Sequence, residues 1–281
     1  MGAAIYAQCR GRAEARGRAQ KAVTQDGRAR VSRLFRFPVK GLSGEALDGV
    51  DVAAGETFPL DRAYAIENGP GAFDARAPRH LPKTAFVMLM RNERLALLDA
   101  RFDEATTKLT IARAGAPVVS GRLDQPVGRA LIEQFIAGFM AGDLRGAPRI
   151  VSAPGHSFSD VAQKCVSIIN LASVREIERV AGRPVDALRF RGNILVEGLA
   201  PWAEFDLVGQ SFSIGEVRLG AFKRIVRCAA TTVNPATGER DVNVPRLISD
   251  AFGHTDCGIY ARIESGGRIE PGMEIAGPVR R

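Results

Sequence analysis

The stretch that decides the fold is Arg224-Ile-Val-Arg-Cys-Ala-Ala-Thr-Thr-Val-Asn-Pro-Ala-Thr-Gly-Glu-Arg-Asp, residues 224–241. Its first part predicts a β-strand over 224–232 that carries Cys228, and an Asn-Pro-x-x-Gly turn follows. Arg227 adjoins the cysteine, and a neighbouring cation favours thiolate over thiol. A thiolate suits a soft metal centre. On composition alone, however, a single cysteine in a strand is more often a buried small hydrophobe.

Short β segments are predicted on both sides of this stretch. We expect strands over 31–37, 50–52, 63–66, 86–90, 108–112, 166–169, 193–197, 211–214, 217–219, 258–263 and 274–276. The run 86–90 has the apolar character of a fully buried strand.

Three helices are expected among these strands. The first presents one apolar face, made by Leu131, Ile132, Phe135, Ile136, Phe139 and Met140. A second begins at Ser173, which with Glu176 predicts a capping box. A third has Pro245 in its first turn and Gly253 as its end.

The elements predict a mainly β protein with a few helices. An N-terminal β-rich domain over residues 31–150 is expected to pack on a C-terminal β-barrel over residues 151–281. Residues 1–30 are rich in Arg, Ala and Gly and poor in large apolar side chains, so we expect a disordered basic tail. A start codon placed upstream, or a targeting role, are the alternative explanations of this segment.

The net charge of +8 is concentrated at the chain ends. Residues 1–30 hold seven basic and two acidic side chains, and the last two residues are arginines, which leaves the rest of the chain near +1. This distribution argues against a nucleic-acid-binding surface. No apolar run approaches the roughly 20 residues of a membrane span, and no signal-peptide core is present, so we expect a cytoplasmic protein without membrane contact.

The four cysteines, at positions 9, 165, 228 and 257, lack C-x-x-C spacing. A zinc or iron–sulfur site made by this chain alone is therefore not expected. No G-x-G-x-x-G loop for a dinucleotide is present either.

Residues 224–241 resemble the signature of the MOSC superfamily, which includes the mitochondrial amidoxime-reducing component and the C-terminal domain of molybdenum-cofactor sulfurase. The pattern R-C-x-x-T-T-V-x-P-x-T-G is met at Arg227, Cys228, Thr231, Thr232, Val233, Pro235, Thr237 and Gly238. Four further segments resemble the family in the same order: Phe37-Pro-Val-Lys-Gly, Leu60-Asp-Arg-Ala-Tyr, Arg189-Phe-Arg-Gly-Asn-Ile-Leu-Val, and the closing Gly258-Ile-Tyr-Ala with Ile269-Glu-Pro-Gly-Met-Glu-Ile. The resemblance spans roughly residues 31–277 and implies a MOSC-type β-barrel behind a MOSC N-terminal β domain.

The resemblance also implies a molybdenum cofactor, a molybdopterin with one molybdenum, and a role for each matched residue. Cys228 would be the catalytic residue and the protein ligand of the metal. The residues that would bind the pterin or its phosphate are Lys40, Arg62, Asp160, Arg191, Asn193, Arg227, Thr232 and Tyr260. Arginine forks and a lysine are suitable partners for a dianionic phosphate.

Most of these residues also have an ordinary structural explanation. Lys40 and Arg62 could be solvated surface charges, Asp160 a turn residue, and Asn193 a polar residue at a strand edge. Among residues outside the set, Cys165 is expected in the core. Cys257 is either a structural residue or a second functional thiol near Cys228. His254 and Asp256 either line the pocket around Cys228 or have no part in it.

The chain departs from the family at two positions, where Gly41 and Val226 replace common serines. The resemblance implies a molybdenum-dependent oxidoreductase that reduces N-hydroxylated or N-oxide small molecules. A separate ferredoxin- or cytochrome-type electron-transfer protein would be its partner, since the sequence offers no electron carrier of its own. The alternatives are a cofactor carrier or sulfur-transfer protein, and a β-barrel that has lost the cofactor.

Overall fold

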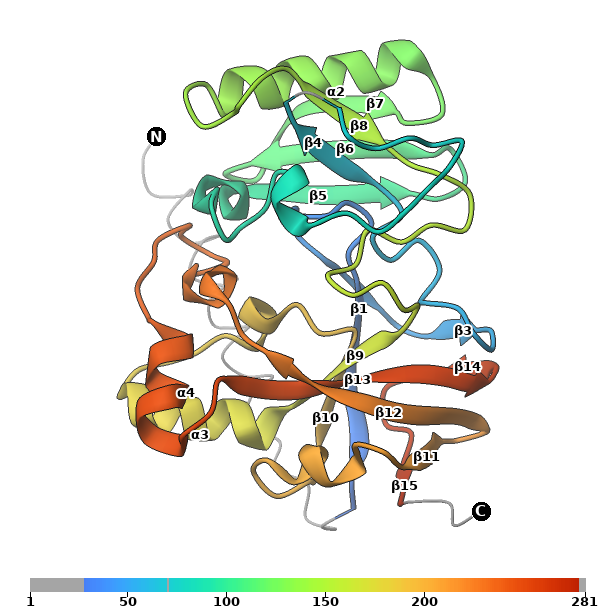
Figure 1. Cartoon of the computed structure of the whole chain (residues 1–281), viewed down its shortest axis with the longest axis vertical. Helices are drawn as coiled ribbons and strands as arrows, with labels where there is room; N and C mark the ends of the chain where they lie inside the picture. The colour runs from blue at the N-terminus through green and yellow to red at the C-terminus, as the bar shows by residue number, and fades with distance from the viewer. Residues whose placement is uncertain (1–27, 70, 278–281) are drawn as a thin grey trace, which may run out of the picture.

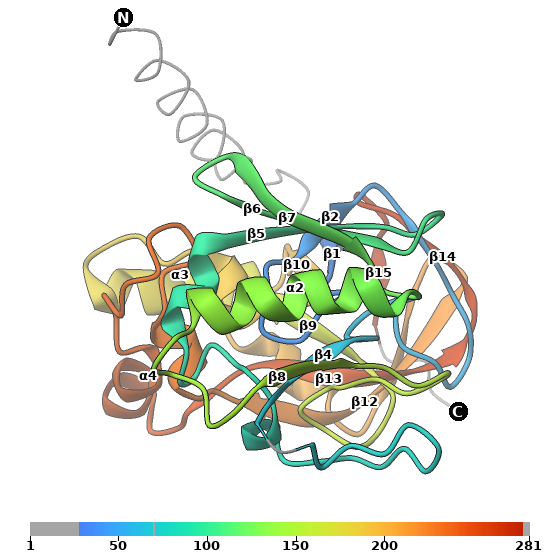
Figure 2. The ribbon, with the colours of Figure 1, turned by 90° about the horizontal axis from the view of Figure 1, so that it is seen from above.

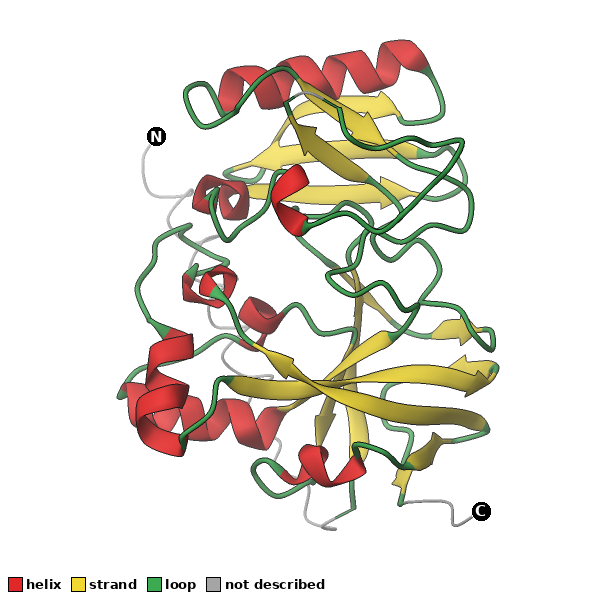
Figure 3. Cartoon of the chain, in the orientation of Figure 1, coloured by secondary structure: helices red, strands yellow, loops and turns green. Residues whose placement is uncertain are grey.

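The computed structural model describes residues 28–69 and 71–277, in which strands predominate (Figure 1; Figure 3). An eight-stranded sheet with the order β15-β11-β12-β13-β9-β10-β1-β2 curls into a half-barrel. Its strands are β1 (Arg30–Arg36), β2 (Glu45–Leu47), β9 (Val166–Asn170), β10 (Ile194–Glu197), β11 (Ser211–Ile214), β12 (Val217–Val226), β13 (Asp256–Ser265) and β15 (Ile275–Ala276). The predicted mainly β class with a few helices is confirmed.

A second unit lies at the top of Figure 1. Its strands are β4 (Ala65–Asn68), β5 (Leu98–Asp103), β6 (Lys108–Arg113), β7 (Ala116–Arg122) and β8 (Pro148–Val151). They form one three-stranded sheet, β5-β6-β7, and one ladder, β4-β8. Helix α2 (Pro126–Phe139) lies against both (Figure 2), and its Ile132, Ile136 and Phe139 join their apolar core.

The remaining elements are short. Strands β3 (Val50–Val52) and β14 (Gly267–Ile269) pair with each other, and helices α3 (Leu171–Ala181) and α4 (Val244–Phe252) lie beside the large sheet. The 3-10 helices are η1 (Lys83–Ala85), η2 (Glu93–Leu97), η3 (Ala187–Phe190), η4 (Ala203–Leu207) and η5 (Ala229–Thr232).

Strands β9 and β10 are parallel and buried on both faces. Ile168 and Ile194 face the interior of the half-barrel, whereas Ile169 and Leu195 pack against the core under α3 and α4. This arrangement explains why both segments read as nearly continuous apolar runs.

The first two strands belong to the eight-stranded sheet, since β1 pairs with β10 and with β2. The chain therefore starts in the half-barrel, where β3 also pairs with β14, crosses to the second unit after β3, and returns at β9. The loop after β1, which carries Lys40, consequently lies at the junction of the two units. Most of the predicted basic tail lies outside the described residues, but Arg30 already begins β1.

The predicted strand over 86–90 is wrong. Only Phe86 forms a β-bridge, to Glu67, and the chain then turns. The amide of Met88 donates to the Asn92 side chain at 3.2 Å, and the amide of Asn92 returns a bond of 2.9 Å to the Met88 carbonyl. The side chain of Asn92 thus replaces the strand partner that the apolar run predicted.

The predicted capping box at Ser173 and Glu176 is also wrong. Helix α3 begins two residues earlier, where the Asn170 side chain accepts the amide of Ala172 at 3.0 Å. The Ser173 hydroxyl instead donates to the buried Glu204 carboxylate at 2.8 Å. By contrast α4 has Pro245 in its first turn and ends at Gly253, as predicted.

Candidate functional site

Cys228 lies just beyond the end of β12, not inside a strand as predicted, and it precedes the η5 turn. The turn forms because the Thr231 hydroxyl bonds to the Cys228 carbonyl at 2.9 Å and the Thr232 hydroxyl to the Ala229 carbonyl at 2.7 Å. Threonines that bond back to their own backbone compete with strand pairing. The turn leaves the Cys228 side chain half-buried at the wall of a cavity.

This cavity has a volume of about 350 Å³ and lies between the two units. One wall comes from the half-barrel, with Cys228, Thr231 and Tyr260. The other comes from the loop after β1 and from residues 88–90. The predicted site residues that line it are Lys40, Arg62, Asp160, Arg191, Asn193, Arg227, Cys228 and Tyr260.

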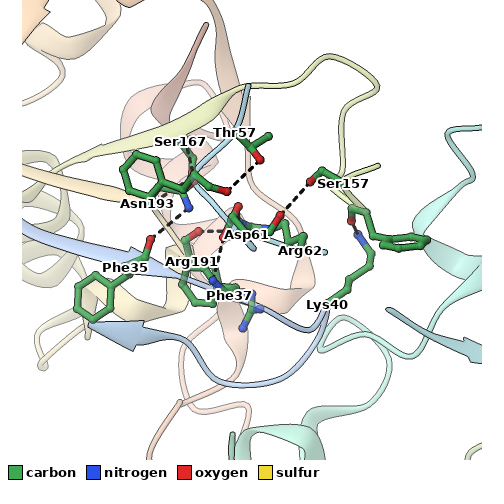
Figure 4. A network of polar contacts seen from close by, with 12 residues as sticks. Phe35, Phe37, Lys40, Thr57, Asp61, Arg62, Ser157, Ser167, Arg191 and Asn193 are labelled. Carbon is green, nitrogen blue, oxygen red and sulfur yellow. Dashed lines mark hydrogen bonds and ion pairs between the residues drawn. The ribbon is translucent and has the colours of Figure 1, made fainter. Parts of the chain in front are cut away.

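Two arginines, Arg62 and Arg191, line the cavity (Figure 4). Arg62 forms an ion pair with Asp61 and donates to the carbonyl of Arg191 at 3.0 Å. Both guanidinium groups lie over the ring of Phe37, with distances from ring centre to guanidinium carbon of 4.9 Å for Arg62 and 4.3 Å for Arg191. The aromatic face holds the two cations side by side despite their repulsion.

Arg191 has no carboxylate partner among the described ion pairs, and its Nη1 donates to the Leu42 carbonyl at 2.7 Å. Burial and then the neighbouring Arg62 charge lower the pKa of Arg191 to about 9. This lowered pKa means that the charged form of Arg191 destabilises the folded protein. A bound anion would offset this destabilisation.

Lys40 lines the same cavity as Arg62 and Arg191, and the three residues are called the cation cluster. Its ammonium group is buried and donates to the Phe158 carbonyl at 2.8 Å and to Asp160 at 2.5 Å. Desolvation lowers the pKa of Lys40, although the Asp160 charge opposes this. Lys40, Arg62 and Arg191 thus converge on one space with two nearby carboxylates, which fits a doubly charged phosphate.

Arg227 lines the cavity, and its guanidinium group is bound by the protein's own backbone. Its guanidinium donates to the carbonyl oxygens of Cys257, at 2.7 Å from Nε, and of Phe190, at 3.0 Å. These bonds fasten the end of β12 to the start of β13 and to η3. Burial lowers the pKa of Arg227, and the described residues give it no carboxylate partner.

Asn193 and Thr232 are engaged by the protein itself. The Asn193 amide accepts the amide and hydroxyl of Ser167 at 3.0 and 2.8 Å and donates to the Phe35 carbonyl at 3.2 Å (Figure 4). Thr232 does not line the cavity, because its hydroxyl is held by Ala229 and by Arg240. Asn193 thus lines the cavity with its amide already engaged, whereas Thr232 lies outside the lining.

Tyr260 presents its phenol at the cavity wall, and no hydrogen bond within the described chain engages it. Burial raises the pKa of Tyr260 to about 12, although the Arg227 charge opposes this. The hydroxyl therefore keeps its proton at neutral pH and is available as a donor.

The other residues considered in the sequence either line the cavity or lie away from it. Cys165 lines the cavity, but burial raises the pKa of its thiol to about 12. Cys257 is fully buried in the core under α3 and α4. His254 packs among the rings of Trp202, Phe205 and Phe252, away from the cavity. Asp256 does not line the cavity either.

The two residues that depart from the family pattern, Gly41 and Val226, lie in different surroundings. Gly41 has a φ of 89°, and a Cβ there would lie 2.9 Å from the Val87 carbonyl. A serine would therefore be strained at this position. Val226 is 64% exposed at the end of β12.

The cavity residues that sequence reasoning missed include Lys83, Ser167 and Lys223, which no local pattern marks. It also missed the role of Asp61, which accepts the amide of Phe37 at 2.8 Å and pairs with Arg62. Within the residues described, no group of three or more His, Cys, Asp or Glu side chains is placed to hold a metal ion. A metal bound at Cys228 would need further ligands from the group that carries it.

Comparisons with known proteins find two family domains along the chain. A family model described as the MOSC domain matches residues 153–276, and one described as the MOSC N-terminal beta barrel domain matches residues 28–143. A molybdenum cofactor sulfurase of Caenorhabditis elegans is 33% identical over 115 residues, which cover 38% of this chain and 16% of the relative. A molybdenum cofactor sulfurase of Caenorhabditis briggsae is 25% identical over 263 residues, 87% of this chain and 35% of the relative. The chain spans about a third or less of the length of these relatives.

Two solved structures are also similar. YiiM from Geobacillus stearothermophilus is 24% identical, with a TM-score of 0.33 over 41% of this chain and 54% of that one. The YuaD protein from Bacillus subtilis is 14% identical, with a TM-score of 0.39 over 88% of this chain and 93% of that one. Among the described residues, no helix is both long and apolar enough to cross a membrane.

Proposed function

Because the chain belongs to the MOSC-domain proteins, with a MOSC N-terminal domain before the MOSC domain, we propose that its cavity binds a molybdenum cofactor. We propose further that the loaded protein is an oxidoreductase that reduces N-hydroxylated or N-oxide compounds. One observation carries the proposal. The thiol of Cys228 shares a single cavity with the cation cluster of Lys40, Arg62 and Arg191.

The cation cluster would bind the pterin phosphate. Two arginine forks and a buried ammonium group supply donors from both units, and they are held in place before any ligand arrives. Such fixed donors bind an anion with little reorganisation. Cys228 would be the protein ligand of the metal, and the η5 turn holds its backbone so that the side chain faces the cavity.

When bound, the cofactor would supply a molybdenum centre able to accept the oxygen atom of an N-oxygenated substrate, with oxidation of the metal. For a hydroxylamine the balanced reaction takes two electrons and two protons and yields the amine and water. The Tyr260 hydroxyl, protonated at neutral pH, is placed to donate a hydrogen bond within the cavity. The electrons would come from a separate ferredoxin- or cytochrome-type protein, since the sequence has no dinucleotide loop or cluster cysteines.

A cofactor carrier or sulfur-transfer protein is the second candidate. The two curated relatives, named molybdenum cofactor sulfurases, favour it. In that case Cys228 would hold the cofactor or its sulfur for delivery and no substrate would be reduced.

An assay with a chemical electron donor separates the two candidates. Wild-type protein loaded with the cofactor should reduce a hydroxylamine or amidoxime, Cys228→Ala should not, and Cys165→Ala should retain activity because that thiol is buried and protonated. Loaded wild-type protein that reduces none of these compounds, but passes its cofactor to an acceptor enzyme, would exclude the reductase and support the carrier.

A further inference from the structure

Arg240 lies outside the cavity, on the segment that follows the Asn-Pro-Ala-Thr-Gly turn. Its side chain is one-third exposed, at 33%. Each of its two terminal nitrogens contacts a different unit of the protein.

The Nη1 atom holds the half-barrel side. It donates to the Ala229 carbonyl at 2.9 Å and to the Thr232 hydroxyl at 2.8 Å. Both acceptors belong to the η5 turn, directly after Cys228. The Nη1 contacts therefore fix the turn that presents the cysteine.

The Nη2 atom holds the opposite side. It donates to the carbonyls of Leu89 and Met90 at 3.2 and 2.9 Å, and to the Glu93 carboxylate at 3.0 Å. Leu89 and Met90 line the cavity across from the Cys228 turn. This segment is not a strand, so no sheet pairing holds it in place.

We propose that Arg240 is a positioning residue that fixes the distance between the Cys228 turn and the segment 88–90. It acts through the backbone of both walls and does not contact the cavity itself. The inference rests on the proposed function, because the width of the cavity then decides how firmly the cofactor is retained.

The planar fork of arginine is essential to this role. Five acceptors on two units need two nitrogens held at a fixed separation, and a lysine offers a single ammonium group. The Glu93 contact alone is an exposed ion pair and contributes little. The carbonyl and hydroxyl contacts, which are charge-assisted, carry the bridge.

The alkylation rate of Cys228 in cofactor-free protein tests the proposal directly. Iodoacetamide modification is followed by peptide mass spectrometry in wild type, Arg240→Met and Arg240→Lys. Arg145→Met is the matched control, because Arg145 also binds backbone carbonyls, those of Asn68 and Thr84 at 3.1 and 2.8 Å, but only within the second unit. The melting temperature of each variant is measured in parallel.

Loss of the bridge should raise the Cys228 alkylation rate by about tenfold in both Arg240 variants, the equivalent of one charge-assisted hydrogen bond. Arg145→Met should stay close to wild type. An unchanged rate in folded Arg240→Met, an equal rise in Arg145→Met, or a wild-type rate in Arg240→Lys would each overturn the proposal.

The dissociation rate of bound cofactor gives a second measurement. Molybdenum should leave Arg240→Met faster than wild type after dilution, and equal rates would overturn the role in retention. A wild-type protein that binds no molybdenum would refute the proposed function instead, whereas the alkylation rates would still decide whether Arg240 joins the two walls.

Discussion

Arg62 donates a 3.0 Å hydrogen bond to the carbonyl of Arg191, and both residues have left-handed backbones, with φ of 54° and 52°. Residues of the second unit and of the half-barrel thus meet at one point, with Phe37 beneath both side chains. Non-glycine residues with positive φ are uncommon and cluster at functional sites. We propose that this contact is the basis of an anion site.

Arg191→Met should weaken the binding of inorganic phosphate by about tenfold, since a charge-assisted fork is lost. The stability of the ligand-free protein should not fall, because the replacement removes a buried cation without a carboxylate partner. Phosphate binding is measured by calorimetry and unfolding by urea titration. Arg246→Met, which removes an exposed ion pair with Asp250, is the control and should leave phosphate binding unchanged.

A loss of stability in Arg191→Met with unchanged phosphate affinity would show that Arg191 is structural. The carbonyl contact to Leu42 would then be its main purpose.

Tyr260 should remain protonated well above pH 10 in the folded protein. Burial raises its pKa to about 12, so the folded state is favoured by this group below pH 10, and that contribution is lost as the pH rises toward 12. The absorbance change near 295 nm is compared between wild type and Tyr260→Phe, with circular dichroism as the check on folding. A difference signal with a midpoint near pH 10 in folded protein would contradict the buried phenol.

Asp241→Asn should destabilise the protein by about 3 kcal/mol at neutral pH, because it leaves the buried Arg189 guanidinium without its counterion. The two side chains lie 2.6 Å apart and are 10% and 1% exposed. Arg189 in turn donates to the Thr232 carbonyl at 3.0 Å, so the η5 turn loosens as well. Urea unfolding measures the change, with Asp250→Asn on the surface as the control.

The effect of Asp241→Asn should depend on pH. Burial raises the pKa of Asp241, but hydrogen bonds from Asn234 and Arg189 outweigh this and place it below the ordinary 3.8. The stabilisation is therefore present above that value and lost as the pH falls through the lowered pKa. A stability difference between wild type and variant that does not shrink at all as the pH falls below 3.8 would contradict this assignment.

Gly41→Ser, which restores the common family residue, should destabilise the protein by about 1–2 kcal/mol, because φ is 89° and the new Cβ would meet the Val87 carbonyl. Thermal unfolding measures this loss of stability. The control is Gly55→Ser, at another positive φ where a Cβ meets nothing within 4 Å. Equal effects at the two sites would assign the cost to backbone conformation alone.

Many of the strands and two of the three helices could be predicted because their apolar residues follow a clear period, whereas β2, β5, β7 and β8 were not expected. The half-barrel interior repeats every second residue in β12, and α4 carries both of its end signals. The segment 86–90 could not be predicted, since a short apolar run has no period that separates a strand from a buried turn.

The cavity residues could be named only through the family resemblance. Lys40 and Arg191 are 151 residues apart in sequence, and no local pattern places them at one site. The hydrogen bonds that Arg227 and Asn193 make with neighbouring residues could not be predicted either, because only tertiary structure brings these partners together. The contacts that Arg240 makes with both cavity walls also join segments far apart in sequence, so they could not be predicted either.

The molybdenum content of purified protein tests the central claim most directly. Wild type and Cys228→Ala are produced in a host that makes the cofactor, and metal and protein are quantified together. The account predicts about one molybdenum per wild-type chain, as one thiolate and one anion site allow, and a large loss in the variant. Molybdenum absent from both proteins, or equal in both, would contradict the assignment of Cys228 as its ligand.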